Sequence, residues 1–333
     1  MTMTVSVVQP DELGASEEKL WREYQSLSPL GRHPFFSLTY VRAACRTDEG
    51  GRVAVVQDDG KISAFIPYTS GADRIATTLG GGYTGLDSLV SGDDHIDLRS
   101  AIRKAGLRGW RFSHAPTELR PLDPYRYQGD YHGELINFAD LRNGYDSYIK
   151  GLSDSVKKRI SRTGTYRRAV QRELGEISFD WNSADPSHLD LLLDWKSAQF
   201  ESVQHWLSDP RVHKLVRDLA DSESTDCAGV MSVLSAGAKP ISIVFSLRCG
   251  TIIAPWLLAY DSEYSRFSPG TIEWLLLFEE AARRGVEMVD FGYGDDRYKQ
   301  RFGNATYGVS GGGVWASHLG STVRSLYRRA RFR

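Results

Sequence analysis

The chain has 333 residues, 41% of them hydrophobic and 11% aromatic, which is too long for one ordinary hydrophobic core, so we expect two packed domains. A formal net charge of −1 excludes a global attraction to nucleic acid or an anionic membrane and leaves only regional contacts with polyanions. Cys45, Cys227 and Cys249 are odd in number and far apart, so they indicate buried, reduced thiols rather than a disulfide framework or a thiolate zinc site.

No targeting or membrane-spanning pattern stands out in the sequence. The first residues, MTMTVSVVQPDELG, lack a basic region followed by an apolar run, and no apolar stretch reaches membrane-spanning length. We therefore expect a cytoplasmic protein, and its basic segments leave room for a peripheral contact with the inner face of an anionic membrane.

The first half of the chain has a mixed α/β pattern. In chain order, the expected elements are a helix at 16–26, strands at 52–57 and 61–69, a helix at 94–105 and a strand at 108–113. Asp59-Gly60 between the first two strands is a strong signal for a tight hairpin turn.

The second half repeats this order with clearer strands. The expected elements are strands at 230–234, 241–248 and 251–260, a helix at 271–284 and a strand at 287–292. Gly285 is placed to end the helix as a C-terminal glycine does. The repeated order indicates an internal duplication.

A basic helical region, 145–174, separates the halves. Its cations are Lys157, Lys158, Arg159, Arg162, Arg167, Arg168 and Arg172. We therefore expect an N-terminal domain at 1–140, a C-terminal domain with this basic leading helix at 141–322, and an Arg-rich tail at 323–333. Such charge runs are either solvated faces or docking surfaces for a phosphorylated, nucleotide-linked or lipid-linked acceptor.

A loop that opens into the 271–284 helix contains Arg266, Ser268, Pro269, Gly270 and Thr271. A helix start presents unpaired backbone N–H groups and a positive dipole end, which suits a pyrophosphate. Gly270 permits close approach and Pro269 fixes the turn. On local sequence alone, Ser-Pro-Gly is equally an ordinary helix start.

Short motifs follow one another in a fixed order in the second half. They are Tyr260 and Tyr264, Ser268-Pro269-Gly270, Asp290-Phe291-Gly292-Tyr293-Gly294, and Tyr298-Lys299. With PFFSLTYVRA near the start and Leu193-Asp194-Trp195-Lys196, this order resembles the CelD-like or BioF-like acetyltransferase family of the GNAT superfamily. The resemblance covers most of the chain, most densely 145–303. It implies tandem GNAT-like domains of the α/β class, with a mixed α+β sheet and a degenerate N-terminal copy.

The loop departs from the superfamily pattern R/Q-x-x-G-x-G/A in two positions. It reads Arg266-Phe-Ser-Pro-Gly-Thr271, with proline at the first glycine position and threonine at the last. The resemblance nevertheless implies that acetyl-CoA or another acyl-CoA binds here as the donor. The related Fem-type transferases also have tandem GNAT-like domains but use aminoacyl-tRNA.

The resemblance implies that an acceptor amine or hydroxyl attacks the thioester directly. Leu258 or Ala259 would then supply a backbone N–H to the oxyanion, and Tyr298 would protonate the leaving thiolate, unless it is a half-buried tyrosine at a helix start. Asp290 and Asp295 are candidate bases because open α/β sites form at strand ends.

These candidates have structural alternatives. Asp290 is equally suited to cap Gly292 or to pair with Lys299, and Asp295 to be a turn residue. Lys299 would meet a phosphate of donor or acceptor, or form an ion pair. His205 would reach the acceptor side or simply pack on its helix.

We therefore expect an acyltransferase that moves an acetyl or longer acyl group to an amine or hydroxyl of a sugar, glycolipid or polysaccharide precursor. The alternatives are a Fem-like ligase that uses aminoacyl-tRNA and a non-catalytic GNAT-like scaffold. The sequence has no HExxH, GxSxG or Walker pattern, and we expect no metal and no specific nucleic acid in the first reading.

Overall fold

The computed structural model describes residues 2–80, 84–127, 133–199, 207–222, 224 and 226–317. The chain divides into two compact units. Unit 1 consists of Met1–Gly31, Phe35–Leu135 and Tyr307–Arg333, and unit 2 of Arg32–Pro34 and Ile136–Thr306. Among the residues described, none of the helices combines the length and apolar character that crossing a bilayer requires.

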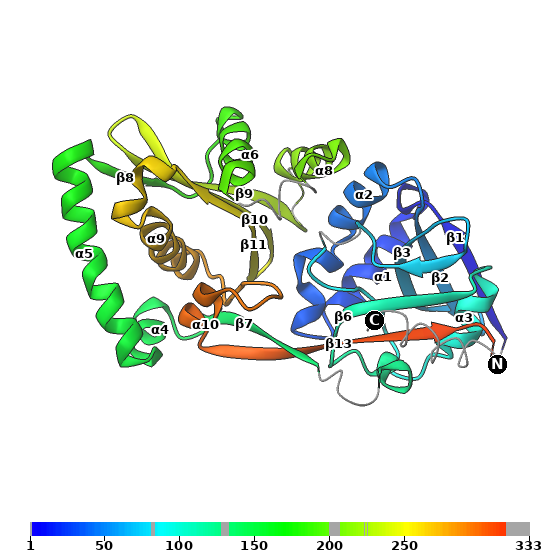
Figure 1. The fold of residues 1–333 in the computed structure, drawn as a ribbon. Coiled ribbons are helices and arrows are strands. Elements are labelled where there is room, and N and C mark those ends of the chain that lie inside the picture. The colour runs from blue at the N-terminus through cyan, green and yellow to red at the C-terminus, as the bar shows by residue number, and fades with distance from the viewer. Residues whose placement is uncertain are drawn as a thin grey trace, which may run out of the picture. The chain divides into compact units, whose positions relative to one another are not determined.

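Unit 1 is built on a mixed sheet in the order β1-β2-β3-β4-β6-β13, with β5 paired to β3 (Figure 1). Its strands are β1 (Met3–Val8), β2 (Gly51–Asp58), β3 (Lys61–Ser70), β4 (Ile75–Thr77), β5 (Val90–Ser91), β6 (Gly109–Pro116) and β13 (Ala305–Trp315). Its α-helices are α1 (Ala15–Gln25), α2 (Leu38–Thr47) and α3 (Leu98–Lys104). The predicted hairpin is confirmed: β2 and β3 pair antiparallel, and Asp59 and Gly60 have φ of 49° and 81° in the turn.

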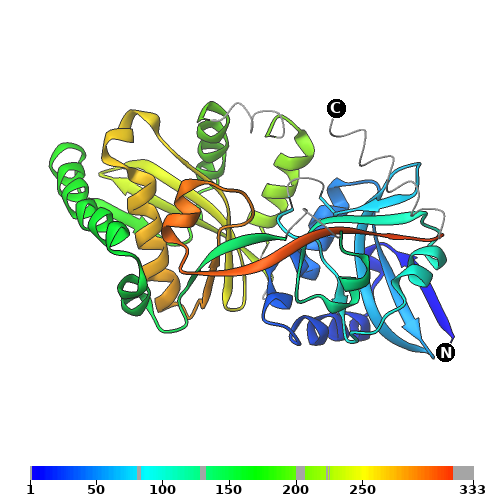
Figure 2. The same ribbon diagram turned by 60° about the horizontal axis from the view of Figure 1, so that its bottom comes forward.

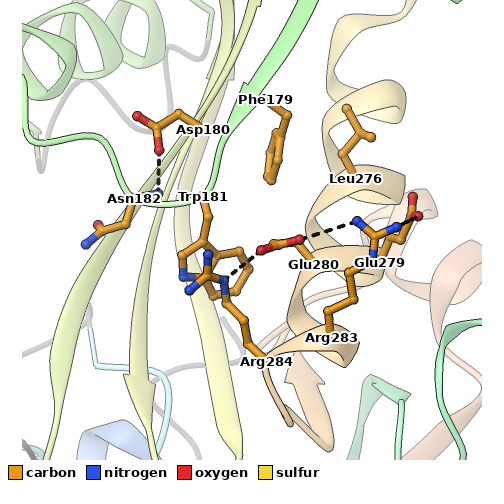
Figure 3. A pocket seen from close by; sticks show the side chains of 9 residues that line it. All are labelled: Phe179, Asp180, Trp181, Asn182, Leu276, Glu279, Glu280, Arg283 and Arg284. Carbon is orange, nitrogen blue, oxygen red and sulfur yellow. Dashed lines mark hydrogen bonds and ion pairs between the residues drawn. The ribbon is translucent and has the colours of Figure 1, made fainter.

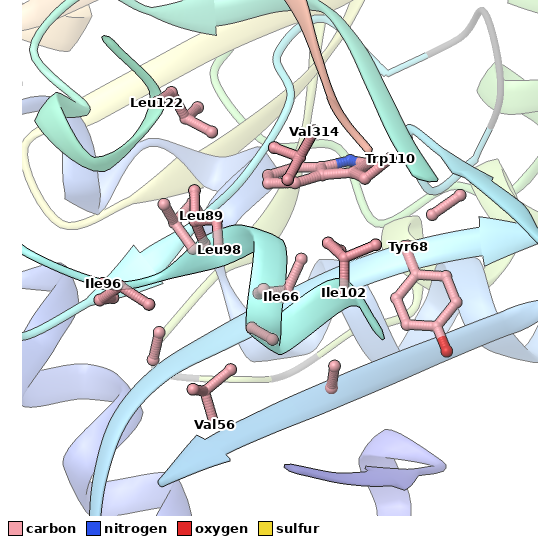
Figure 4. Packing of buried hydrophobic residues seen from close by; sticks show 14 of the residues in the cluster. Val56, Ile66, Tyr68, Leu89, Ile96, Leu98, Ile102, Trp110, Leu122 and Val314 are labelled. Atoms are coloured by element: carbon pink, nitrogen blue, oxygen red, sulfur yellow. The ribbon is translucent and has the colours of Figure 1, made fainter. Parts of the chain in front are cut away.

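The core of unit 1 follows from the alternation of side chains along β2 and β3. Ala54, Val56, Ala64 and Ile66 lie in one cluster with Trp110 of β6 and the apolar side of α3 (Figure 4). On the other face, Phe65 contacts Trp21 of α1, with ring centroids 4.9 Å apart. The sheet is therefore covered on both faces.

The strands of unit 2 follow the order β7-β12-β11-β10-β9-β8, with parallel and antiparallel pairs. Its strands are β7 (Glu134–Asp140), β8 (Ile177–Asp180), β9 (Ala228–Ala236), β10 (Lys239–Cys249), β11 (Ile252–Tyr260) and β12 (Met288–Asp290). Its α-helices are α4 (Tyr145–Gly151), α5 (Asp154–Leu174), α6 (Ser187–Gln199), α8 (Pro210–Ala220), α9 (Pro269–Arg283) and α10 (Arg297–Phe302).

Helix α9 covers one face of this sheet, and α6 lies on the other (Figures 1 and 2). Trp274, Leu277 and Phe278 of α9 pack in one cluster with Val244 and Ile253 of the strands. This apolar layer fixes where α9 begins relative to β11, which sets the geometry of the site described below.

The two units repeat one order of elements. In unit 1 the order is β1, α1, α2, β2, β3, β4, α3 and β6, and in unit 2 it is β8, α6, α8, β9, β10, β11, α9 and β12. The pairing repeats too, because β4 runs parallel to β6 as β11 does to β12. The internal duplication and the mixed α/β class predicted from the sequence are confirmed.

The units are not the contiguous domains expected from the sequence. The last strand, β13, pairs antiparallel with β6 of unit 1, whereas β7 pairs with β12 of unit 2. A boundary at 140 with a C-terminal domain running to 322 therefore differs from the structure, in which Tyr307 onward joins unit 1. The predicted tail at 323–333 lies outside the described residues. Cys45, Cys227 and Cys249 are buried, as predicted.

Candidate active site

The central strands of unit 2 separate after a short parallel pairing. β11 pairs with β12 at Ile252↔Met288 and Ile253↔Val289, and β12 ends at Asp290 while β11 continues to Tyr260. On its other side, β11 pairs with β10, and the register of this pairing shifts between Pro255 and Leu257, so that Trp256 is an extra residue of β11. Such a bulge bends the strand. Within the described residues, the edge of β11 beyond Ile253 faces no partner strand on this side.

The direction of each peptide on this edge follows from strand alternation. The Asp261 N–H donates to Ile241 O, and the Ser242 hydroxyl donates to Ala259 O at 3.4 Å, so Ala259 faces β10. Leu258 and Tyr260 therefore direct their N–H and C=O groups away from β10. Of the two predicted oxyanion donors, Leu258 and Ala259, it is Leu258 that directs its N–H towards the open edge.

Helix α9 begins against this same edge. A Cβ on Gly270 would lie 3.5 Å from Cδ1 of Tyr260 and 3.8 Å from Cδ2 of Leu258. Ser268, the residue before the helix, has φ 52° and ψ 52°, and its side chain makes no capping hydrogen bond. A non-glycine residue in this conformation costs of order 1–3 kcal/mol and is concentrated at functional sites. The loop thus keeps an uncapped helix start beside an open strand edge.

The backbone at the start of α9 uses some of its donors internally. The N–H groups of Thr271 and Ile272 both donate to Ser268 O. Pro269 has no N–H, which leaves Gly270 as the first-turn amide of this loop nearest the edge. Arg266 pairs with Glu173 at 2.8 Å and lies over the Phe267 ring at 4.5 Å, with its side chain 68% exposed. Its guanidinium is therefore at the surface beside the loop.

Asp290 at the end of β12 is buried and engaged on both oxygens. Oδ1 accepts the Gly292 N–H at 2.6 Å, and Oδ2 lies 3.0 Å from Nε2 of His33, a residue of unit 2 that is also buried. The capping of Gly292, an alternative from the sequence, is present, but the partner is His33 and not Lys299. A carboxylate 2% exposed is a poor base for an incoming acceptor, so a positioning role fits Asp290 better.

Tyr298 lies in an aromatic stack at the start of α10. Its ring stacks on Trp274 with centroids 5.4 Å apart and meets the edge of Phe291 at 6.1 Å. Burial raises the pKa of the Tyr298 phenol well above its usual range, and the charges of Asp296 and Asp290 raise it further. The phenol therefore stays protonated at neutral pH, as a proton donor must.

The remaining candidates, Lys299, Asp295 and His205, differ in their surroundings. Lys299 is buried, lies 3.2 Å from Asp296 and donates to Tyr293 O, so the ion-pair alternative is present. Asp295 is exposed in the loop before α10. His205 lies outside the described residues.

Two side chains of α6 that sequence reasoning did not select reach the open edge. Lys196 Nζ donates to Leu258 O at 3.1 Å, and Gln199 Nε2 donates to Tyr260 O. Burial lowers the pKa of Lys196, Asp296 opposes this shift and Lys299 adds to it. The spacing of three residues on one helix, which places both side chains on one face, was the available signal.

A fully buried carboxyl lies further along α9. Glu273 is 0% exposed, its Oε1 accepts from the Ser232 hydroxyl at 3.2 Å, and its Oε2 has no hydrogen-bond partner in the described structure. Burial raises the pKa of Glu273 well above its usual range. The carboxyl is therefore protonated inside the fold.

Three arginines meet outside the aromatic stack. Arg297 and Arg301 are one turn apart on α10, and Val156 and Ile160 of α5 pack against the cluster that contains Phe302, which brings Arg159 close. Burial lowers the pKa of Arg301, and the charges of Arg159 and Arg297 lower it further. Among the ion pairs of the described residues, none joins these three to a carboxylate. This arginine cluster is a site of unbalanced positive charge.

The corresponding gap in unit 1 is filled by the chain itself. β4 pairs with β6 at Ile75↔Gly109 and Ala76↔Trp110, so these strands also separate early. There, Asp87 Oδ2 accepts the N–H groups of Ser113 at 2.8 Å and His114 at 2.7 Å. A buried carboxylate thus lies in the gap of unit 1 and binds β6, the counterpart of β12, whereas the open edge of unit 2 belongs to β11.

The helix start of unit 1 is occupied as well. Asp97 caps α3 by accepting the Ser100 N–H at 3.0 Å. Hydrogen bonds from the Ser100 side chain and backbone lower the pKa of the Asp97 carboxyl. A carboxylate at this position competes with a phosphate for the same N–H groups and dipole. In unit 1, carboxylates of the chain therefore occupy both the strand gap and the start of α3. This is the structural reason for regarding unit 1 as the degenerate copy.

A groove of about 660 Å³ lies elsewhere on unit 2 (Figure 3). It is lined by Phe179, Asp180, Trp181, Asn182, Leu276, Glu279, Glu280, Arg283 and Arg284. Its charges already pair with each other, as in Arg283–Glu279 at 2.5 Å and Arg284–Glu280 at 2.8 Å. The described residues also contain no group of three or more His, Cys, Asp or Glu side chains placed to hold a metal ion.

Comparison with known proteins agrees with this geometry. Residues 157–300 match the family model described as an acetyltransferase (GNAT) domain. No curated protein matches the chain. The fold is similar to that of FemX, with TM-score 0.60 and 10% identity over 91% of this chain and 98% of that one.

Two further solved structures share the fold. A tandem GNAT protein from the clavulanic acid biosynthesis pathway has TM-score 0.54 and 10% identity, covering 95% of this chain and 99% of that chain. L-PGS from Bacillus licheniformis has TM-score 0.53 and 13% identity, covering 96% and 97%. At these identities the likeness concerns the fold, and it establishes a tandem GNAT fold for this chain.

Proposed function

We propose that the chain is an acyltransferase with one active site, in unit 2, that takes an acetyl or longer acyl group from acyl-CoA. The observation that supports this most strongly is the contrast between the units. In unit 2 an uncapped helix start adjoins the open edge of β11, whereas in unit 1 Asp97 caps the helix start and Asp87 lies in the gap between the strands, bound to β6. The donor pyrophosphate would bind at 266–271, and the thioester would lie along β11.

The reaction would be a direct transfer. The acceptor amine or hydroxyl attacks the thioester carbon, and the Leu258 N–H stabilises the oxyanion that forms. Collapse of this intermediate expels the thiolate of coenzyme A, to which the protonated Tyr298 phenol donates. The acceptor gives up its proton to water, and water returns a proton to the Tyr298 phenolate. No residue of the chain is assigned as the base, because Asp290 is buried and both of its oxygens are engaged.

The arginine cluster of Arg159, Arg297 and Arg301 supports an anionic acceptor. Guanidinium groups bind phosphate and carboxylate oxygens through paired hydrogen bonds. We therefore favour a phosphorylated or lipid-linked sugar, glycolipid or polysaccharide precursor as acceptor. Peripheral contact with an anionic membrane, through the exposed cations of α5, belongs to the same proposal. We propose that the protein acts at the cytoplasmic face of this membrane.

A Fem-like ligase is the second candidate, favoured by the similarity of the fold to that of FemX. Its donor would be aminoacyl-tRNA, which has no coenzyme A pyrophosphate to place at 266–271. Calorimetric titration with acetyl-CoA therefore separates the two functions. A non-catalytic scaffold would bind acyl-CoA and release no thiol in the presence of acceptors.

The matched variants Gly270→Asp and Gly270→Asn test the donor site. Either side chain fits, because a Cβ at 270 meets nothing closer than 3.5 Å. The Asp variant places a carboxylate at the helix start, as Asp97 does in unit 1, and should weaken acetyl-CoA binding at least roughly tenfold relative to Asn. Equal affinities for the Asp and Asn variants would place the pyrophosphate elsewhere.

A further inference from the structure

Helix α6 supplies side-chain donors where a neighbouring strand would supply backbone donors. Lys196 and Gln199, three residues apart, donate to alternate carbonyls of β11, those of Leu258 and Tyr260. These are the carbonyls that β12 would engage if its pairing continued past Val289. The helix therefore keeps the edge of β11 in place while the strands stay apart.

The two donors differ in charge although their structural task is the same. Gln199 shows that a neutral side chain satisfies a carbonyl of this edge. A half-buried ammonium is costly to desolvate, and the pKa of Lys196 is lowered by that burial. Asp296 and Lys299, before and on α10, are among the charged groups that face Lys196. The positive charge of Lys196 therefore exceeds what a hydrogen bond to this edge requires.

The position of the ammonium supplies an explanation. In an extended strand, the N–H and C=O of one residue point to the same side, so Lys196 Nζ, 3.1 Å from Leu258 O, also lies beside the Leu258 N–H. That N–H is the proposed oxyanion donor. A positive charge at this point would stabilise the negative charge that develops on the thioester oxygen.

We propose that Lys196, in its protonated form, is a catalytic residue that stabilises the oxyanion together with the Leu258 N–H. This inference rests on the proposed acyl-CoA function. As the acceptor attacks, the π electrons of the thioester carbonyl move to its oxygen beside Lys196. They return when the C–S bond breaks and the thiolate leaves with a proton from Tyr298, while the acceptor loses its proton to water, which reprotonates Tyr298. Lys196 keeps its proton throughout.

The test compares Lys196→Met, Lys196→Arg and the control Gln199→Met with the wild type. Lys196→Met should lower kcat by roughly 10² to 10³, the usual loss for one oxyanion donor, with acetyl-CoA affinity kept within about threefold. Gln199→Met removes a bond of the same kind without removing charge and should cost far less. Equal losses for the two methionine variants would overturn the proposal.

The pH profile and a spectroscopic signature separate charge from structure. Activity should fall as alkaline pH deprotonates Lys196, and Lys196→Arg should remove this limb and keep part of the rate. If Lys196 were a base instead, an acidic limb would disappear with the lysine. The carbonyl ¹³C resonance of bound [1-¹³C]acetyl-CoA should move downfield in the wild type and less in Lys196→Met.

The failure of this proposal is distinct from failure of the proposed function. If the wild type binds acetyl-CoA and the methionine variant leaves the ¹³C shift and kcat unchanged, Lys196 has only a structural role. If the wild type does not bind acetyl-CoA at all, the acyl-CoA function is wrong and the assignment of Lys196 is wrong with it.

Discussion

Replacing Glu273 with glutamine should change how the stability of unit 2 depends on pH. The Glu273 carboxyl is 0% exposed, and burial raises its pKa well above its usual range. The folded chain therefore keeps this proton after the unfolded chain has lost it. Stability from Glu273 is fully present below the unfolded pKa and declines as pH rises towards the folded pKa.

The magnitude follows from proton linkage. While the folded chain retains this proton and the unfolded chain has lost it, each increase of one pH unit lowers the free energy of unfolding by about 1.4 kcal/mol. At roughly 2–4 °C per kcal/mol, the melting temperature of Glu273→Gln should rise relative to wild type by about 3–6 °C for each such pH unit. The amide has its own unsatisfied group, so the comparison concerns the pH dependence and not the absolute stability.

The assay is thermal unfolding followed by circular dichroism at several pH values. Glu280→Gln is the matched control, because Glu280 lies on the same helix but at the surface, paired with Arg284 at 2.8 Å. Its curve should run parallel to that of the wild type. If the curves of Glu273→Gln and the wild type were parallel too, the carboxyl would be ionised in the fold and the reasoning would be refuted.

Three further substitutions test the site and its degenerate counterpart. Tyr298→Phe keeps the stack on Trp274 and deletes the hydroxyl, so kcat should fall at least roughly tenfold while acyl-CoA affinity stays, and a smaller loss would assign Tyr298 to structure. Asp290→Asn should act mainly on stability, by roughly 1–3 kcal/mol in denaturant titration, because the carboxylate accepts the Gly292 N–H and faces His33; a stable but inactive variant would restore it as a base. Asp97→Ala should cost about 1 kcal/mol through loss of the α3 cap without changing the calorimetric stoichiometry of one acetyl-CoA per chain, and a second binding event would show that unit 1 retains a donor site.

Local patterns predicted the elements that position the site. Hydrophobic runs and Asp59-Gly60 predicted the β2–β3 hairpin, and Gly285 predicted the end of α9, since turn and cap geometry depend on neighbouring residues only. The loop that contains Arg266 opens into α9, as predicted. The loop pattern did not predict the left-handed conformation of Ser268, because a glycine is the usual sequence signal for that conformation and this position is a serine.

Long-range contacts were beyond such patterns. His33 and Asp290 are 257 positions apart by their residue numbers, and a histidine beside a proline carries no sign of a buried carboxylate partner. The exchange of β7 and β13 was missed because strand registers between distant segments leave no local signature. Lys196 was noted only as a family match, since a helical lysine looks solvent-exposed until the helix is placed on β11.

The two copies of the fold differ in what they do with the same two positions. In unit 1, Asp97 caps its helix, which typically adds about 1 kcal/mol, and Asp87 binds N–H groups of β6 inside the gap between the strands. In unit 2, the helix begins after Ser268, which has a strained conformation and makes no side-chain cap. The open edge of β11 accepts a hydrogen bond from the Lys196 side chain of α6. Unit 1 has therefore taken the more stable solution at each position, and it is closed to an anionic donor. Unit 2 keeps the less stable one at each position, which is the expected condition of a site that must exchange its own contacts for those of a ligand.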